Sequence, residues 1–436
     1  MHIFFSGIGG TAIGPLALIA KQAGYTVSGS DKQDSQYIHY LRKHGITDIH
    51  IGQTYEQIAA VHDRAPIDWF VFTSALPMEQ PDAPELRFCR EQGIKTSKRD
   101  ELLNQIIEDR HLQLIAIAGT HGKTTTTAMA IWLFKQLGIP VSYSVGAKIS
   151  FGEMGEYDQA SQYFVYEADE FDRNFLSFRP RMALIAGIDW DHPDIYPTRD
   201  EYNQAFREFL EQSDQATIWN DDADTLGLED VSSSTTPRYI PLSKDDRAIS
   251  EQLTLPGLVN RQDAWLVANA VHHLTNRPLD ELTVHLNAFP GVSRRFEQLV
   301  PNLYTDYAHT PGKIEGAMQL AHEVAGNDVV VVYEGLHNTR QHFIKDDLRH
   351  LFDTAKHLYI VPSYLAREDK NLPLLSPTDL RELLSHEAKA KSTAAAMDEN
   401  LAVRIRSHLE DGDLVLCLTA GGGHSLDEWL RKEFTA

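Results

Sequence analysis

The residues best suited to chemistry lie in a glycine-containing segment, residues 119–125, with the sequence GTHGKTT. The segment follows an apolar run over 112–118 and opens a helical pattern. Backbone N–H groups at a helix N-terminus bind phosphate, a lysine neutralises the outer phosphates, and a threonine hydroxyl suits Mg²⁺. The spacing predicts a phosphate loop rather than a plain glycine turn. Its candidate residues are Gly119, Thr120, His121, Gly122, Lys123, Thr124 and Thr125.

A second glycine loop lies at the start of the chain, where GIGGTA over 7–12 follows an apolar run that we expect to be a strand. Asp31 lies at the end of the next expected strand. The pattern matches the fingerprint of loops that approach a pyrophosphate closely, with the acid placed to meet a ribose. Such loops bind NAD, FAD, nucleotide sugars or nothing. We favour a pyrophosphate ligand, with Gly7, Gly9, Gly10, Thr11, Asp31 and Ser74 as candidate binding residues.

Acidic residues and a histidine follow two further apolar runs. The sequence EADEFD over 167–172 comes after the expected strand 163–166, and Asp191-His192 comes after the run 182–188. Ligand sites of parallel sheets lie at the carboxyl ends of strands, so these groups can converge beside the phosphate loop. Carboxylate oxygen is a typical ligand of Mg²⁺ and imidazole a less typical one. The competing interpretations are a solvated loop and a structural histidine.

The last third of the chain carries a third set of candidates. Residues 306–311, DYAHTP, end an expected strand, and Arg294-Arg295 precede it. Guanidinium groups there could reach phosphates from a separate domain. Taken alone, these residues and Arg340 are better explained as turn and surface residues.

The elements that must position these groups form three successive stretches of alternating strand and helix patterns, which is typical of α/β domains with parallel sheets. With 436 residues, the chain is long enough for about three domains. We predict domain boundaries at 1–105, 106–292 and 293–436.

Charge and composition exclude several classes of protein. Lys and Arg number 40 against 62 Asp and Glu, a net charge of −22, which disfavours a nucleic-acid partner. No apolar stretch approaches the roughly 20 residues that cross a bilayer, and the first residues resemble a strand rather than an export signal. Two cysteines are too few for a disulfide framework. We expect a cytoplasmic protein without a membrane partner.

In combination, the motifs resemble the Mur ligase family of peptidoglycan synthesis. The resemblance covers nearly the whole chain and rests on the order of five motifs, which lie at 7–14 with 29–31, 119–126, 167–172, 191–192 and 306–311. It implies a Rossmann-like N-terminal domain for the UDP of a UDP-N-acetylmuramoyl substrate. It also implies a central P-loop ATPase-type domain with a parallel sheet, and a Rossmann-like C-terminal domain that closes over ATP and receives an amine.

The resemblance also implies roles for individual residues, with ATP and Mg²⁺ as cofactors. Thr124, Glu167 and His192 would hold the metal, while Asn260, Arg295 and Asp306 would join the phosphate loop in binding ATP. The implied catalytic residues are Lys123, Glu167, His192, His309 and Arg340. Gly187 and Asp263 stand where the family often has Asn.

Two reactions of the family stay open, both starting from the carboxylate of UDP-N-acetylmuramate. One is an ATP-dependent acid–amino-acid ligation that adds L-alanine, and the other adds a recycled L-Ala-γ-D-Glu-diamino acid tripeptide. Phe171, Glu334 and Asn338-Thr339 resemble the recycling enzymes, whereas Arg340 resembles the alanine-adding ones. We favour L-alanine because that step is essential to wall synthesis.

Two readings from other classes compete with the ligase. A nicotinamide-dependent oxidoreductase would use Gly7, Gly9 and Asp31 but leaves Lys123 unexplained. A non-catalytic nucleotide-binding regulator would bind ATP without releasing phosphate.

Overall fold

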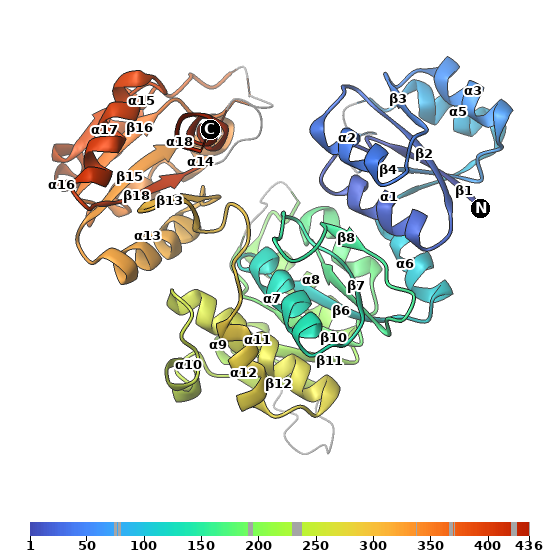
Figure 1. Ribbon diagram of the computed structural model, residues 1–436, viewed down its shortest axis with the longest axis horizontal. Coiled ribbons are helices and arrows are strands. Elements are labelled where there is room, and N and C mark those ends of the chain that lie inside the picture. Colours follow the sequence, from blue (N-terminus) through green and yellow to red (C-terminus); the bar gives the residue numbers. More distant parts are fainter. Residues whose placement is uncertain are drawn as a thin grey trace. The chain divides into compact units, whose positions relative to one another are not determined.

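The computed structural model describes residues 1–73, 76, 80–190, 195–228, 238–336, 338–365, 369, 371–419 and 425–435 (Figure 1). The chain forms two compact units, of which the first contains Met1–Thr254 and Gln262–Pro290 and the second Leu255–Arg261 and Gly291–Ala436. Three separate sheets account for the strands of the described residues, two in the first unit and one in the second.

The N-terminal sheet has the strand order β3-β2-β1-β4-β5, and all its neighbours are parallel. The chain runs outward from β1 in both directions, so the carboxyl end of β1 lies at the point where the winding reverses. Its strands are β1 (His2–Ser6), β2 (Thr26–Asp31), β3 (Ile49–Ile51), β4 (Trp69–Phe72) and β5 (Lys95–Lys98). Its helices are α1 (Ile13–Gln22), α2 (Gln36–Lys43), α3 (Tyr55–Arg64), α5 (Pro84–Gln92) and α6 (Arg99–Asp109).

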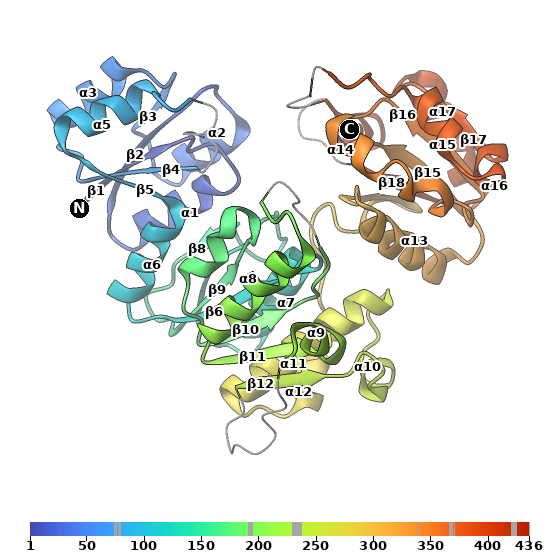
Figure 2. The ribbon, with the colours of Figure 1, turned by 180° about the vertical axis from the view of Figure 1, so that it is seen from behind.

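The central sheet has the order β12-β11-β10-β6-β9-β7-β8, parallel except for the short edge strand β8. Its strands are β6 (Gln113–Ala118), β7 (Val141–Ser144), β8 (Gly155–Glu156), β9 (Tyr163–Glu167), β10 (Met182–Ile185), β11 (Gln215–Trp219) and β12 (Tyr239–Leu242). Helix α7 (Lys123–Gln136) covers the face seen in Figure 1, and α8 (Arg199–Glu211) covers the opposite face in Figure 2. The other helices of this stretch are η1 (Phe171–Ser177), α9 (Asn220–Leu226), α10 (Arg247–Glu251), α11 (Leu258–Thr275) and α12 (Leu279–Asn287).

The C-terminal sheet has the order β13-β14-β18-β15-β16-β17, with only β13 antiparallel to its neighbour among the described strands. Its strands are β13 (Glu297–Val300), β14 (Leu303–Asp306), β15 (Val329–Glu334), β16 (His357–Val361), β17 (Ser392–Ala394) and β18 (Leu414–Leu418). Its helices are α13 (Pro311–Ala325), α14 (Asn338–Ile344), η2 (Asp347–His350), α15 (Pro377–Leu383), α16 (His386–Ala390), α17 (Glu399–Glu410) and α18 (Leu426–Phe434).

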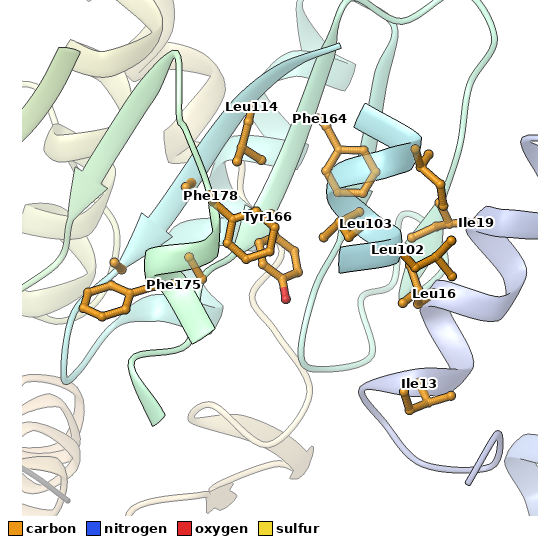
Figure 3. Packing of buried hydrophobic residues seen from close by; sticks show 14 of the residues in the cluster. Ile13, Leu16, Ile19, Leu102, Leu103, Leu114, Phe164, Tyr166, Phe175 and Phe178 are labelled. Carbon is orange, nitrogen blue, oxygen red and sulfur yellow. The ribbon is translucent and has the colours of Figure 1, made fainter. Parts of the chain in front are cut away.

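The core of the first unit is a continuous apolar cluster that joins its two sheets. Side chains of α1 and α6, among them Leu16 and Leu102, belong to the same cluster as Phe164 and Tyr166 of β9 (Figure 3). Alternate residues of β1 enter opposite layers, because Ile3 belongs to this cluster and Phe4 to a separate one beneath α3 and α5. Burying both faces of a parallel sheet in this way holds the carboxyl ends of its strands in place.

The predicted α/β fold with three parallel or mostly parallel sheets is confirmed. The boundaries at 105 and 292 stay a prediction. None of the described helices is long and apolar enough to cross a membrane.

Candidate active site

The phosphate loop connects the central strand β6 to helix α7, as its sequence predicts. Gly119 and Gly122 have φ angles of +137° and +75°, which L side chains rarely adopt. A Cβ on Gly119 would lie 2.8 Å from the carbonyl oxygen of Gly187, and Thr120 N donates to that same oxygen at 2.8 Å. Gly187, which departs from the family pattern, therefore lies against the loop.

Lys123 is held by a buried carboxylate. Its Nζ donates to Glu170 Oε2 at 2.7 Å and to Gly119 O at 2.5 Å, and the side chain of Glu170 is only 1% exposed. Burial alone would lower the pKa of Lys123, but the carboxylates of Glu170, Asp169 and Glu167 outweigh it and raise that pKa. The lysine thus keeps its positive charge beside the loop, where a phosphate would compete with Glu170 for it.

Two predicted metal ligands meet at the first turn of α7. Thr124 Oγ1 donates to Glu167 Oε1 at 2.9 Å, and Gly146 N donates to Glu167 Oε2 at 2.9 Å. A Cβ on Gly146 would lie 2.7 Å from that carboxylate oxygen, so a larger residue there would displace the Glu167 side chain from its present position. Within the described ranges no three His, Cys, Asp or Glu side chains already form a metal site. A hydroxyl and a carboxylate beside a phosphate loop do fit Mg²⁺, which takes few protein oxygens and completes its shell with phosphate and water.

The structure describes the other predicted residues of the loop but not the predicted metal ligand that follows β10. Thr120 Oγ1 lies 2.7 Å from Tyr202 Oη and donates to Asp189 O at 2.5 Å, which ties the loop to α8 and to the segment after β10. His121 Nε2 lies 4.0 Å from Asp189 Oδ2. The side chain of Thr125 is half-buried. His192 and its neighbour Asp191 lie outside the described residues.

A buried carboxyl group lies behind the phosphate loop. Asp263 of α11 is 3% exposed, and a Cβ on Gly122 would lie 3.0 Å from its Oδ1. Burial raises the pKa of Asp263 to about 8, opposed by the hydroxyl of Thr126. At neutral pH the group is therefore mostly a neutral acid, closer in charge to the Asn that the family often has here than to a carboxylate.

The first glycine loop has the predicted position at the carboxyl end of β1. Gly7 N donates to Ser30 O at 2.8 Å, and Gly9 N donates to Asp31 Oδ2 at 2.8 Å. A Cβ on Gly9 would lie 3.0 Å from the Asp31 carboxylate. Gly10 N closes the turn on Gly7 O at 3.0 Å, and Thr11 has an exposed side chain. Ser74 lies outside the described residues.

In the second unit, the predicted residues Arg295, Asp306 and His309 lie at the end of β14, and Arg340 of α14 is near enough to act on the charge of His309. Arg295 lies over the Tyr307 ring at 5.2 Å, and the rings of Tyr307 and His309 are 4.7 Å apart. Burial lowers the pKa of His309 to about 3, with further effects of Lys313, Arg340 and Arg295. His309 is thus neutral beside cationic groups. Burial raises the pKa of Asp306 to about 6, against the effect of Arg295.

Asn260 also belongs to the second unit. Its side-chain amide donates to Pro256 O at 2.8 Å, so the amide is fixed on the turn that precedes α11. The predicted contact of this residue with adenine stays a prediction.

Sequence reasoning missed three contributors to the two loops. Glu170 belonged to the acidic run, but its pairing with Lys123 was not foreseen, and neither Gly146 nor the buried Glu85 of α5 was singled out. A signal existed for Gly146, which closely follows a strand whose carboxyl end lies next to that of β9. Glu85 had none, because it lies 79 residues from its partner Ser6.

Comparisons with known proteins match three successive domains of one family to the three sheets of this chain. Residues 2–111 match the domain described as Mur ligase family, catalytic domain, residues 117–263 the Mur ligase middle domain, and residues 294–421 the Mur ligase, glutamate ligase domain. The UDP-N-acetylmuramate–L-alanine ligase of Clostridium beijerinckii is 30% identical over 96% of this chain and 95% of its own length. The chain belongs to the Mur ligase family.

Other members of the Mur ligase family extend the comparison. The UDP-N-acetylmuramate–L-alanine ligase of Clostridium acetobutylicum is 30% identical over 98% of this chain and 96% of its own length. The crystal structure of the UDP-N-acetylmuramate–alanine ligase of Thermotoga maritima superposes with a TM-score of 0.74 at 22% identity, covering 100% of this chain and 98% of the other. A murein peptide ligase from Psychrobacter arcticus gives 0.62 at 20% identity, with 100% and 98% coverage. At these identities the structures establish the fold.

Proposed function

We propose that this chain is an ATP-dependent ligase that joins the carboxylate of UDP-N-acetylmuramate to the amino group of L-alanine. The observation that carries the proposal is that two carboxylates at the carboxyl end of β9 contact the start of α7, where Glu170 pairs with Lys123 and Glu167 accepts from Thr124. The choice of substrates follows the two relatives that are named for this reaction and that match this chain over nearly their whole length. In this proposal the three sheets hold the nucleotide sugar, ATP and the amine in chain order.

Activation of the carboxylate is the step that needs the phosphate loop. A carboxylate oxygen attacks the γ-phosphorus of ATP, the bond to the β,γ-bridging oxygen breaks, and ADP leaves, so that an acyl phosphate remains. The two reactants are anions, and Lys123 together with the N–H groups of the loop lowers their repulsion. Thr124 and Glu167 would hold Mg²⁺, which supplies further charge neutralisation at the phosphates.

Amide formation then needs a neutral amine next to the acyl phosphate. The amine attacks the carbonyl carbon, a tetrahedral intermediate forms, inorganic phosphate leaves with the C–O bonding pair, and the nitrogen loses one proton to the departing phosphate or to water. The cationic cluster of Arg295, Arg340 and Lys313 around the neutral His309 suits the anionic groups of ATP or of an amino acid. Exclusion of water protects the acyl phosphate from hydrolysis.

The cellular setting of the proposal is the cytoplasm, where ATP is available and thiols stay reduced. Both cysteines, Cys89 and Cys417, are free and buried, which suits a reducing compartment.

Phosphate release by the full chain tests the proposal. The protein is supplied with ATP, Mg²⁺ and UDP-N-acetylmuramate, and the amine is L-alanine, glycine, L-serine or the L-Ala-γ-D-Glu-diamino acid tripeptide. We expect phosphate release to depend on both UDP-N-acetylmuramate and L-alanine, with the amide product seen by mass spectrometry. If the tripeptide were the only one of the four amines to cause phosphate release, it would replace L-alanine as the proposed substrate. ATP binding without phosphate release for any amine would contradict the proposal that the protein is a ligase.

A further inference from the structure

A buried glutamate lies beneath the first glycine loop. Glu85, in the first turn of α5, is 1% exposed. Its Oε2 accepts a hydrogen bond from Ser6 Oγ at 2.6 Å, and its Oε1 accepts one from Ser30 Oγ at 2.5 Å. Ser6 and Ser30 are paired neighbours at the carboxyl ends of β1 and β2. One carboxyl group thus bridges the two strand ends that carry the loop and Asp31.

The two serines hold the loop backbone in turn. Ser30 O accepts hydrogen bonds from Gly7 N at 2.8 Å and from Ile8 N at 3.0 Å, and Ser6 directly precedes Gly7. The side-chain amide of Gln53 donates to Ser6 Oγ at 2.7 Å and completes the network. A movement of Glu85 would therefore be passed to the loop by two routes. One is the hydroxyl of Ser6, whose backbone continues into Gly7, and the other is the hydroxyl of Ser30, whose carbonyl oxygen holds Gly7 N.

The hydrogen-bond partners of Glu85 are neutral, although carboxylates are seldom buried without a cation. Among the described residues no Lys, Arg or His forms an ion pair with it. The titratable groups that face it are Asp31 on β2 and Cys89 on its own helix. Burial raises the pKa of Glu85 to about 7, the two serine hydroxyls oppose that effect, and Asp31 adds to it.

We propose that Glu85 is a positioning residue of the nucleotide-sugar site, and that binding of the UDP-sugar diphosphate at the loop above it is coupled to proton uptake by Glu85. The inference rests on the proposed function, because it takes the ligand of this loop to be a nucleoside diphosphate sugar.

The sign of the coupling follows from charge. A bound diphosphate disfavours ionisation of a carboxyl group beneath it, so the complex holds the proton to higher pH than the free protein does. Below the pKa of the free protein Glu85 already carries its proton, and binding takes up none. As the pH rises above about 7, binding must first restore the proton, and affinity falls. Cys89, whose pKa burial raises to about 12, does not titrate in this range.

Isothermal titration of the full chain with UDP-N-acetylmuramate between pH 6 and 9 tests the proposal, using buffers of different ionisation enthalpy to count protons. For the wild type we expect the Kd to rise about five- to tenfold across this range, with net proton uptake above pH 7. Glu85→Gln keeps the size of the side chain and mimics the protonated acid. Its Kd should match the wild-type value at pH 6 and stay flat to pH 9, without proton uptake.

Two further variants separate positioning from general stability. Glu85→Ala removes the acceptor of two buried hydroxyl groups, so the KM for UDP-N-acetylmuramate should rise about tenfold or more while the KM for ATP is unchanged. Glu91→Gln changes an exposed residue of the same helix, which bonds only Tyr55 in the described part, and should keep the wild-type pH profile.

The outcomes are distinguishable. A Glu85→Gln variant with the pH dependence and proton uptake of the wild type would overturn the coupling, and equal changes in the KM values for both nucleotides in Glu85→Ala would overturn the positioning role. Failure of the wild type to bind UDP-N-acetylmuramate at all would instead overturn the proposed function.

Discussion

The two glycine loops share one backbone design and differ in the charges beneath it. Each follows a central strand, opens a helix and contains at least one glycine with a positive φ angle, Gly7 in the first loop and Gly119 and Gly122 in the second. Each is also backed by a buried carboxyl group with a raised pKa, Glu85 under the first loop and Asp263 behind the second. Only the second loop carries a lysine in its own motif, and that lysine is held by Glu170.

In the proposed function, this difference adapts one loop geometry to two ligands. The diphosphate of the nucleotide sugar does not react there, so backbone N–H groups above a buried acid that takes up a proton would be enough to hold it. The triphosphate must react, so its loop needs a permanent cation and metal-binding oxygens at the point where charge develops. The glycines provide space in both loops, and the neighbouring side chains decide the chemistry.

Removal of the cation is the largest expected effect. Lys123→Ala should lower ATP-dependent phosphate release by about a thousandfold or more, because the repulsion between the two reacting anions is then uncompensated. The matched control is Lys135→Ala on the same helix, which removes an ion pair to Glu156 and should change turnover by less than about threefold. Near-normal phosphate release by a folded Lys123→Ala variant would contradict the role of this loop.

The acid behind the phosphate loop should make stability depend on pH. The pKa of Asp263 is raised from 3.8 to about 8, so its contribution is complete below pH 4 and is lost as the pH rises towards 8. The free energy of unfolding should fall by up to about 5 kcal/mol through this group. Asp263→Asn cannot ionise and should remove that part of the slope in urea unfolding at pH 5 and pH 8. Equal slopes in variant and wild type would show that Asp263 is ionised throughout.

The loop glycines should differ in their tolerance of a methyl group. Gly119→Ala places a Cβ 2.8 Å from a backbone oxygen, and we expect a loss of about 1 to 3 kcal/mol in unfolding free energy together with loss of ATP binding. Gly7→Ala has no atom within 4 Å of the added Cβ, so only its φ of +75° opposes it, at about 1 kcal/mol. Urea unfolding compares the two variants, and a larger loss for Gly7→Ala would reverse the comparison.

Much of this arrangement could be predicted from sequence because it is local. An apolar run followed by glycine and then Lys-Thr defines a strand, loop and helix without knowledge of distant residues, and β6 and α7 lie where that pattern places them. The expected strand over 182–188 is shorter, since β10 ends at Ile185 and the chain turns at Gly187 to meet the phosphate loop.

The groups beneath the loops could not be predicted in the same way. Glu85 reaches Ser6 across 79 residues, and nothing in the pattern of α5 marks this acid as buried. The edge strand β8 has only two residues, too few for any alternation of polar and apolar side chains to show. Long-range polar contacts and short edge strands depend on the assembled sheet rather than on local sequence.

The most direct test of the account is whether the two loops bind separate nucleotides. UDP-N-acetylmuramate and a non-hydrolysable ATP analogue with Mg²⁺ are each titrated into the wild type and Lys123→Ala. We expect the variant to bind the ATP analogue at least about tenfold more weakly and to bind UDP-N-acetylmuramate with a Kd within about twofold of the wild-type value. Parallel weakening of both ligands, or unchanged binding of the ATP analogue, would contradict the assignment of one nucleotide to each loop.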